Sequence, residues 1–157
     1  MGQKRNCYGD IISGIKKLAK PEYGNGKTDK HGQPMVEWGK FLQYADKNGF
    51  DKRNVERNGK YKIRIRLPRG TEIIRYGGEM GYYSAPAETQ YEELALPYIK
   101  ETVEYHKYRV NAKYLVLTCV VDKGKVAPGF GSPGGAVQYL HPISIWESVN
   151  RHFLVRI

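Results

Sequence analysis

The sequence predicts an α+β fold, with short N-terminal helices followed by a small, mostly antiparallel β core. The main observation is a change of period near residue 50. Before it, apolar residues recur at helical spacing, and after it they alternate with polar ones as in half-buried strands. A second observation is that Gly and Pro divide the later part into short segments, which is typical of antiparallel sheets.

The N-terminal part is expected to be separate from the β core. Apolar residues at helical spacing predict an amphipathic helix over residues 4–20. Residues 21–34 are polar and Gly-rich, which predicts a loop or linker, and helical spacing returns over residues 36–44. We therefore assign residues 1–45 to an N-terminal helical or linker segment and residues 46–157 to the functional domain.

The clearest strand covers residues 61–67, where Tyr61, Ile63, Ile65 and Leu67 alternate with three basic residues. Short segments elsewhere in the chain repeat this pattern less strongly. We expect further strands at 71–76, 103–110, 114–121, 137–140 and 153–157, a helical turn at 89–96 and a short helix at 144–149.

The formal net charge is +10, and its distribution is uneven. Residues 1–70 contain 17 Lys/Arg and 7 Asp/Glu, so they carry the whole excess. Such a surface can bind nucleic acid or an acidic protein, or can simply be solvated, and composition leaves these alternatives open. No apolar stretch approaches the roughly 18 residues of a membrane-spanning helix, and the N-terminus lacks the apolar run of a signal peptide.

Several common active-site motifs are absent from the sequence. The four His residues show no metal-ligand spacing, so no metal site is expected. No nucleophile elbow, P-loop or Rossmann fingerprint is present. The glycines of the run G-F-G-S-P-G-G lack the strand and helix that a Rossmann phosphate site needs.

The most unusual stretch is Val126–Tyr139, which reads V-A-P-G-F-G-S-P-G-G-A-V-Q-Y. Glycine tolerates positive φ and proline fixes φ, so this composition predicts a pre-shaped loop whose main chain can approach a ligand closely. Gln138 provides the only amide side chain of the run. The alternative interpretation is an ordinary surface turn between two strands.

Two earlier segments carry side chains suited to a dinucleotide. Arg75-Tyr76-Gly77 places a guanidinium at the end of an expected strand, and arginine is well suited to phosphate because its donors form a planar fork. Gly81-Tyr82-Tyr83-Ser84 offers rings that can stack on a nucleobase or nicotinamide. Taken singly, each segment reads equally well as a surface Arg or as packed Tyr residues.

Taken in order, these segments resemble one family. Arg-Tyr-Gly, Gly-Tyr-Tyr-Ser, Ala-Leu-Pro at 95–97, Tyr-Arg-Val at 108–110 and the Gly/Pro run ending in Gln-Tyr are similar to the catalytic domain of the tuberculosis necrotizing toxin family. The resemblance extends from about Phe50 to Ile157. It implies hydrolysis of NAD+ or NADP+ to nicotinamide and the corresponding ADP-ribose, with no further cofactor, on a compact fold related to ADP-ribosyltransferases.

The resemblance also implies roles for individual residues. Arg75 corresponds to the Arg that holds the pyrophosphate, Gln138 to the Gln that contacts the ribose and orients the attacking water, and His106 to a third catalytic residue. Further substrate contacts are expected from the aromatic and Gly-rich segments. These are Tyr76, Tyr82, Tyr83, Ser84, Phe130, Gly134, Gly135 and Tyr139.

One position departs from the family pattern. Leu94 stands directly before Ala-Leu-Pro, where many members have an Arg that is thought to contact the substrate's phosphates. Lys100, Lys107 or Arg109 are candidates to replace that charge. The absence of a Glu near Gln138 argues against the transfer of ADP-ribose to a protein.

The family context implies a toxin that is delivered into a target cell by a dedicated secretion system and acts in its cytoplasm. A toxin of this kind needs an inhibitor in the producing cell, so we expect an acidic immunity protein that binds the basic surface. Two other functions stay open: an RNA-targeting or nucleic-acid-binding module, which the confinement of the charge to residues 1–70 disfavours, and a mono-ADP-ribosyltransferase.

Overall fold

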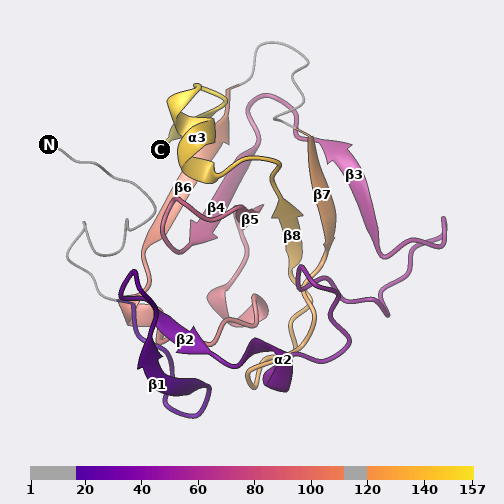
Figure 1. The fold of residues 1–157 in the computed structure, drawn as a ribbon. Coiled ribbons are helices and arrows are strands. Elements are labelled where there is room, and N and C mark those ends of the chain that lie inside the picture. The colour runs from indigo at the N-terminus through magenta and orange to yellow at the C-terminus, as the bar shows by residue number, and fades with distance from the viewer. Residues whose placement is uncertain (1–16, 112–119) are drawn as a thin grey trace, which may run out of the picture.

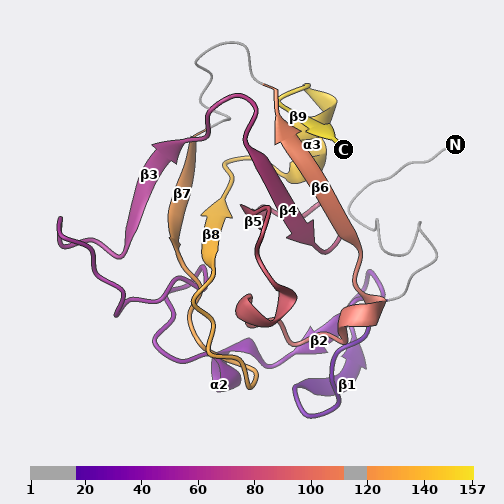
Figure 2. The same cartoon turned by 180° about the vertical axis from the view of Figure 1, so that it is seen from behind.

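The structure is a computed structural model that describes residues 17–111 and 120–157. Its main element is an antiparallel sheet, shown from two sides in Figures 1 and 2. The fold class predicted from the sequence is therefore confirmed. The strands lie in the order β3 (Lys62–Arg66), β7 (Val120–Lys125), β8 (Val137–Leu140), β5 (Tyr83–Pro86), β4 (Glu72–Tyr76), β6 (Tyr105–Val110) and β9 (Leu154–Arg156).

The alternation of apolar and basic residues explains which face of β3 is buried. Ile65 lies opposite Val121 of β7 and packs against the hydrophobic core, while Arg64 and Arg66 point to solvent. The strands β3 and β7 are short because Pro and Gly residues follow closely after each of them, as in the turn at 68–70. The main core is a cluster of buried residues: Leu67, Ile73, Tyr108, Val110, Val121, Tyr139, Ile145 and Leu154.

Helices are few and short in the part of the chain that is described. The helix α3 (Ile145–Asn150) lies beside β9 and contributes Ile145 to the core, and the Ser144 side chain caps it by accepting a 3.0 Å hydrogen bond from the Glu147 N–H. Two 3₁₀ turns, η1 (Tyr91–Glu93) and η2 (Lys100–Thr102), connect β5 to β6. The first of these confirms the helical turn expected at 89–96.

The N-terminal segment differs from the expectation. Residues 21–34, predicted as a loop, form most of a hairpin of β1 (Gly24–Thr28) and β2 (Pro34–Val36). Its turn is closed by Asp29, whose Oδ1 accepts hydrogen bonds from the N–H groups of His31 and Gln33 at 2.8 and 2.9 Å. The helix predicted over 36–44 is reduced to α2 (Trp38–Phe41), because the chain returns to extended backbone at Leu42.

Two expected elements fall partly outside the described residues. The helix predicted at 4–20 lies there except for its last four residues, of which Ala19 forms a bridge to Tyr98 instead of a helical turn. The strand predicted at 114–121 is described only from Val120, and it continues to Lys125. It continues because Val121 to Lys125 pair along β3 and β8.

The described part of the N-terminal segment packs on residues 126–136, which we call the Gly/Pro loop. Phe130 is 4% exposed, and the rings of Tyr23, Trp38 and Phe41 surround it at centroid distances of 5.2, 5.3 and 5.8 Å. Leu42 adds a bridge to Gly129. The division of the chain at residue 45 stays a prediction, but residues 17–45 share an interface with the sheet domain. No helix among the described residues is both long and apolar enough to span a bilayer.

Candidate functional site

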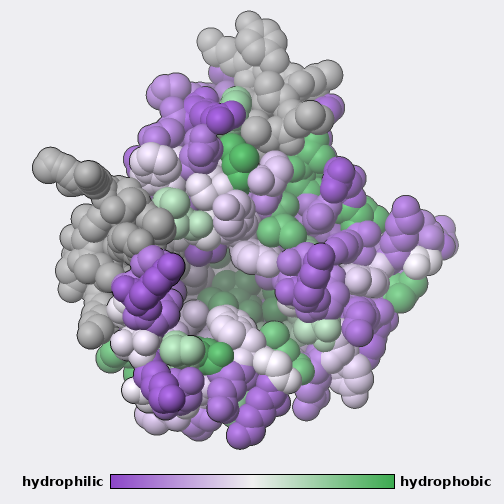
Figure 3. Space-filling view, viewed as in Figure 1, coloured by the Kyte–Doolittle hydropathy of each residue, from purple (hydrophilic) through white to green (hydrophobic). Residues whose placement is uncertain are grey.

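A cavity of about 470 Å³ opens between the sheet, the Gly/Pro loop and the segment 38–49. Figure 3 shows the hollow near the centre of this face, with apolar residues at its floor and mostly hydrophilic residues around it. The size is typical of a pocket for a small organic ligand. Its described lining contains Lys17, Lys47 and Arg75 but no Asp or Glu, so the cavity favours an anionic ligand.

Arg75 is fixed in the wall by its own main-chain neighbours. Its Nε donates to the Gly78 carbonyl at 2.8 Å and its Nη1 to the Tyr83 carbonyl at 3.0 Å. The side chain therefore holds together the connection between β4 and β5. The guanidinium is a positioned positive charge at the cavity, and it also shapes the turn that carries Tyr82 and Tyr83.

A buried carboxylate also anchors the connection between β4 and β5. Glu79 is 2% exposed and accepts a 2.6 Å hydrogen bond from the Tyr108 hydroxyl and a two-point ion pair from Arg156 at 2.9 and 2.7 Å. Burial alone would raise the pKa of Glu79, but the hydrogen bonds from Arg156 and Tyr108 outweigh it and hold that pKa below its ordinary value. Glu79 is thus ionised and structural.

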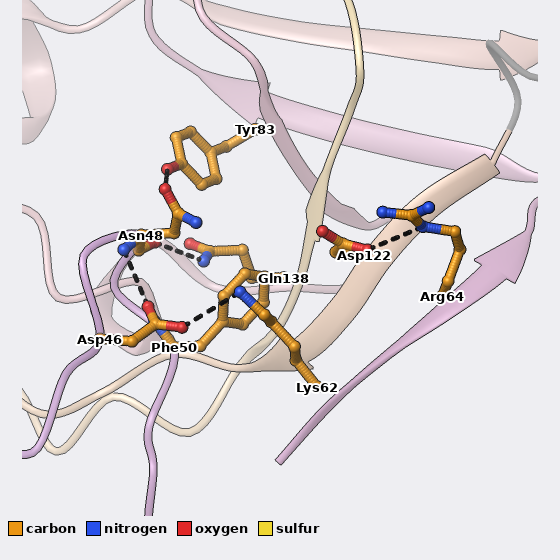
Figure 4. Close-up of polar contacts among 8 residues, drawn as sticks. All are labelled: Asp46, Asn48, Phe50, Lys62, Arg64, Tyr83, Asp122 and Gln138. Carbon is orange, nitrogen blue, oxygen red and sulfur yellow. Dashed lines mark hydrogen bonds and ion pairs between the residues drawn. The ribbon is translucent and has the colours of Figure 1, made fainter. Parts of the chain in front are cut away.

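Gln138 lies on β8, which β5 separates from the strand β4 of Arg75, and it lines the same cavity. Its Nε2 donates a 3.2 Å hydrogen bond to the main-chain carbonyl of Asn48, as Figure 4 shows. This contact assigns the amide orientation, because the carbonyl can only accept. Gln138 Oε1 is therefore the end of the side chain that is left to face a ligand.

Tyr83 meets the same turn from β5. Its hydroxyl lies 3.5 Å from Asn48 Oδ1, at the long end of hydrogen-bond distance. Burial raises the pKa of Tyr83, so the phenol stays protonated and acts as a donor. Tyr76 and Tyr82 also line the cavity, and their contact with a substrate stays a prediction.

Ser84 lines the cavity floor and is held by a buried histidine. Its Oγ lies 2.7 Å from Nε2 of His141, which is 4% exposed. Burial, with a smaller contribution from the positive charge of Arg75, lowers the pKa of His141 to about 4. His141 is therefore neutral at physiological pH, and it orients the Ser84 hydroxyl without a charge.

His106 is placed differently from the expectation. It lies opposite Arg75 in the β4–β6 ladder, but its ring turns to Glu104, with Nε2 2.7 Å from Oε1, and it is absent from the cavity lining. The reason is local: Glu104 is 7% exposed and needs a partner, and His106 provides it. A catalytic role for His106 stays a prediction that this geometry does not support.

Four of the predicted contact residues also lie away from the cavity. Phe130 packs against the N-terminal segment, and Tyr139 is part of the core. Gly134 is required by packing, since a Cβ there would lie 2.6 Å from the carbonyl oxygens of Val126 and Ala127 at a φ of +65°. Gly134 and Gly135 thus shape the loop that brings Val126 to the cavity rather than contacting it themselves.

Leu94, at the position where many family members have an Arg, makes apolar contacts. Leu94 lines the cavity and packs against the small buried cluster of Ala95, Val126 and Ala136. The candidates for a replacement charge do not reach it: Lys107 and Arg109 pair with Glu72 at 3.2 and 3.5 Å, and Lys100 pairs with Glu92 at 3.7 Å. Lys17 and Lys47 are the lysines that line the cavity instead.

Sequence reasoning missed the contribution of residues 38–49 to the site. Trp38, Leu42, Lys47 and Asn48 all line the cavity. Asn48-Gly49 reads as a helix end in the sequence, and no local pattern connects it to Gln138, ninety residues away. Among the residues described, no three His, Cys, Asp or Glu side chains are grouped so that they could hold a metal ion.

Comparison with known proteins identifies relatives of this arrangement. The sequence model of the family described as tuberculosis necrotizing toxin matches residues 66–157. A conidial surface nicotinamide adenine dinucleotide glycohydrolase of Aspergillus fumigatus is 29% identical over 98 residues, which cover 58% of this chain and 40% of that protein. The chain thus spans two-fifths of the fungal relative's length.

Among solved structures, the tuberculosis necrotizing toxin complexed with its immunity factor is similar at a TM-score of 0.53. The superposition covers 92% of this chain and 81% of that one, at 22% sequence identity. At this identity the match supports the fold. The matched stretch 66–157 contains all six predicted site residues that line the cavity: Arg75, Tyr76, Tyr82, Tyr83, Ser84 and Gln138.

Proposed function

The chain belongs to the tuberculosis necrotizing toxin family, and from this premise we propose that it is an NAD(P)+ glycohydrolase toxin domain. The reaction consumes NAD+ and water and yields nicotinamide, ADP-ribose and a proton. The observation that carries the proposal is the convergence of Arg75, Tyr83 and Gln138 on one cavity whose described lining has three cations and no carboxylate. That charge balance suits a dinucleotide with a pyrophosphate.

The chemistry requires positioning more than a strong base. The nicotinamide ring is cationic while it is bonded to the ribose, and it becomes a neutral molecule when that bond breaks. The leaving group therefore needs no proton. The transition state resembles an oxocarbenium ion, and orientation of the reactants alone can supply on the order of 7–11 kcal/mol. In this proposal Arg75 provides fixed positive charge for the pyrophosphate, and Gln138 Oε1 accepts a hydrogen bond from the ribose or from the attacking water.

The proposal also includes a partner and a place of action. We expect a cognate acidic immunity protein that binds the basic surface and covers the cavity, by analogy with the solved complex of the similar toxin with its immunity factor. We further propose delivery into a target cell by a dedicated secretion system, with depletion of that cell's NAD+ in the cytoplasm.

The decisive experiment follows the products of the purified chain. Incubation with NAD+, with NADP+ and with RNA in separate reactions is expected to give nicotinamide and the corresponding ADP-ribose from a dinucleotide and no RNA fragments. Chromatography distinguishes the outcomes: RNA cleavage without nicotinamide release supports a nucleic-acid-directed toxin, and ADP-ribose attached to protein supports a transferase.

The substitution Gln138→Ala is expected to lower nicotinamide release by at least about tenfold, since it removes a neutral hydrogen bond and the orientation that this bond supplies. The matched control is Gln43→Ala, because Gln43 is exposed and is not part of the cavity lining. Equal turnover by the two variants would remove Gln138 from the mechanism.

A further inference from the structure

The turn at 46–50 is a part of the cavity wall that lies outside the stretch matched by the family model. Asp46 holds the turn closed: its Oδ1 accepts hydrogen bonds from the N–H groups of Asn48 at 2.8 Å and Phe50 at 3.0 Å. The main chain adds a 3.1 Å bond from the Gly49 N–H to the Asp46 carbonyl. Asn48 is thus presented at a defined position.

The turn is firmly attached to the sheet. Phe50 is fully buried, and its ring lies so close to Gly124 of β7 that a Cβ there would be 2.6 Å from a ring carbon. Lys62 of β3 contacts Asp46 Oδ2 at 3.4 Å. Burial alone would raise the pKa of Asp46, but the hydrogen bonds from Asn48 and Phe50 outweigh it, so the pKa lies below its ordinary value and the carboxylate is charged at neutral pH.

Besides the N–H that bonds Asp46, Asn48 uses two further polar groups inside the protein. Its main-chain carbonyl orients the Gln138 amide, and its Oδ1 faces the Tyr83 hydroxyl. Two polar groups are left at the cavity, Asn48 Nδ2 and Gln138 Oε1, for which no hydrogen bond to another described residue is found. Figure 4 shows the two carboxamides beside the Tyr83 hydroxyl.

A donor and an acceptor at one place match a ligand hydroxyl, which accepts one hydrogen bond and donates another. Phosphate oxygens only accept, and the adenine edge and the nicotinamide carboxamide carry their donor and acceptor on separate atoms, whereas a hydroxyl combines both roles on one oxygen. Of the groups in a dinucleotide, the ribose hydroxyls fit this pair best.

We propose that Asn48 is a substrate-binding residue, whose side-chain Nδ2 donates to a ribose hydroxyl that donates in turn to Gln138 Oε1. This inference rests on the proposed function, since it names the part of the dinucleotide that the 46–50 turn recognises. A site built to pair with a hydroxyl discriminates strongly against an analogue that lacks it, because buried polar groups are then left without partners. The cavity therefore selects ribose over deoxyribose at this position.

The test uses Asn48→Asp, which is nearly isosteric. It keeps the main-chain carbonyl for Gln138 and an Oδ1 for Tyr83, but it removes the Nδ2 donor. We expect kcat/KM for NAD+ and the affinity for ADP-ribose, measured by calorimetry, each to fall by at least about tenfold, the usual scale for a lost hydrogen bond that leaves a polar partner unpaired. Asn48→Ala is expected to lose as much.

The matched control is Asn58→Asp. Asn58 also sits in a turn, where its Oδ1 accepts a 3.0 Å hydrogen bond from the Lys60 N–H, and it is exposed and outside the cavity lining. The control adds the same charge to a turn outside the cavity, so its kcat/KM and ADP-ribose affinity should equal those of the wild type. Thermal unfolding of all variants separates loss of binding from loss of fold.

Two results would overturn the inference. If Asn48→Asp behaves like the wild type while Asn48→Ala is impaired, Asn48 serves only as the acceptor for Tyr83. If NAD+ analogues that each lack one ribose hydroxyl lose the same factor in Asn48→Ala as in the wild type, no hydroxyl is recognised by Asn48. A wild type that releases no nicotinamide contradicts the proposed function instead, and the ADP-ribose titration then still decides the role of Asn48.

Discussion

Among the described glycines, Gly81 has the least room for a side chain, because the Arg75 side chain lies against it. A Cβ placed at Gly81 would lie 1.9 Å from Nη2 and 2.4 Å from Cζ of Arg75. Arg75 cannot yield easily, because two of its N–H groups are bonded to the carbonyls of Gly78 and Tyr83. Glycine at 81 is therefore a requirement of space.

We expect Gly81→Ala to displace the guanidinium and to lower kcat/KM for NAD+ by at least about tenfold, on the scale of a misplaced positioning group. Gly39→Ala is the control, because a Cβ at Gly39 meets nothing within 4 Å. Initial rates of nicotinamide release, with thermal melts of both variants, measure the effect. A fully active Gly81→Ala protein would show that the position of Arg75 is unimportant for turnover.

A second prediction at the residue scale concerns His141 and the pH dependence of the free energy of unfolding. Its ordinary pKa is 6.5 and burial lowers it to about 4 in the folded state, so below pH 6.5 the unfolded chain takes up a proton that the folded chain does not. The free energy of unfolding should therefore fall as the pH drops from about 6.5 to about 4, by up to about 3 kcal/mol. Above pH 6.5 this residue contributes no pH dependence.

Urea unfolding at a series of pH values checks this, with His141→Asn as the comparison. Asn can still hydrogen-bond Ser84 but does not titrate, so its curve should lack this slope between pH 6.5 and 4. Asp46 and Glu79 have pKa values below the ordinary 3.8 and 4.5, so their stabilising contributions begin to be lost as the pH falls toward those ordinary values, but both proteins share this loss and it cancels in the comparison. Parallel curves for the two proteins would contradict the burial argument.

At the scale of elements, the Gly/Pro loop has a role that its composition did not reveal. Residues 126–136 hold the N-terminal segment through Phe130 as well as shaping the cavity wall. Gly131 helps, since a Cβ there would lie 2.9 Å from the Tyr23 hydroxyl at a φ of +75°. The loop thus joins the segment that carries Trp38 and Leu42 to the sheet domain.

Phe130→Ala is expected to destabilise this interface by about 3–5 kcal/mol, the usual cost of removing a buried aromatic ring. Hydrogen exchange should become faster in residues 17–45 than in the sheet strands, and the KM for NAD+ should rise because Trp38 and Leu42 line the cavity. Val55→Ala serves as the control, since Val55 is 55% exposed. Uniformly faster exchange across the whole chain would show that the segment has no separate stability.

At the scale of the molecule, the question is whether residues 46–157 form a complete domain. The N-terminal segment bonds to the rest through Ala19 and Tyr98, and through 2.9 Å hydrogen bonds from Lys20 N–H to Pro97 and from Ile99 N–H to Leu18. It also supplies part of the cavity lining. The division at residue 45 follows a change in sequence pattern, but the parts of the chain on its two sides share one interface.

Deletion of residues 1–45 is therefore expected to lower the melting temperature by at least about 5 °C, since a few kcal/mol shift Tm by several degrees in a chain of this size. It should also lower kcat/KM, because Trp38 and Leu42 leave the cavity wall. The measurements are differential scanning calorimetry and NAD+ turnover at equal protein concentration. A shortened chain that matches the intact one in both would establish residue 45 as a true domain boundary.

Strand positions and site motifs were the parts of this protein that local sequence could predict. The alternation at 61–67 and the spacing of Gly and Pro locate β3, β4, β6, β8 and α3 correctly, because side-chain period and turn chemistry are local properties. The hairpin at 24–36 was missed, since its stability comes from an Asp29 turn within a polar stretch that reads as a loop. The motifs containing Arg75, Tyr83 and Gln138 were recognisable one by one.

Only the tertiary structure decided which of these residues meet. The sheet order places β8 between β7 and β5, and this brings Gln138 to Asn48 and Tyr83 while His106 turns away to Glu104. Strand order follows from burying apolar faces against one another across the whole chain, so it depends on contacts between distant residues and leaves no local signal. The sequence by itself determined most elements of the sheet domain and the family; long-range packing determined the cavity and the residues that face it.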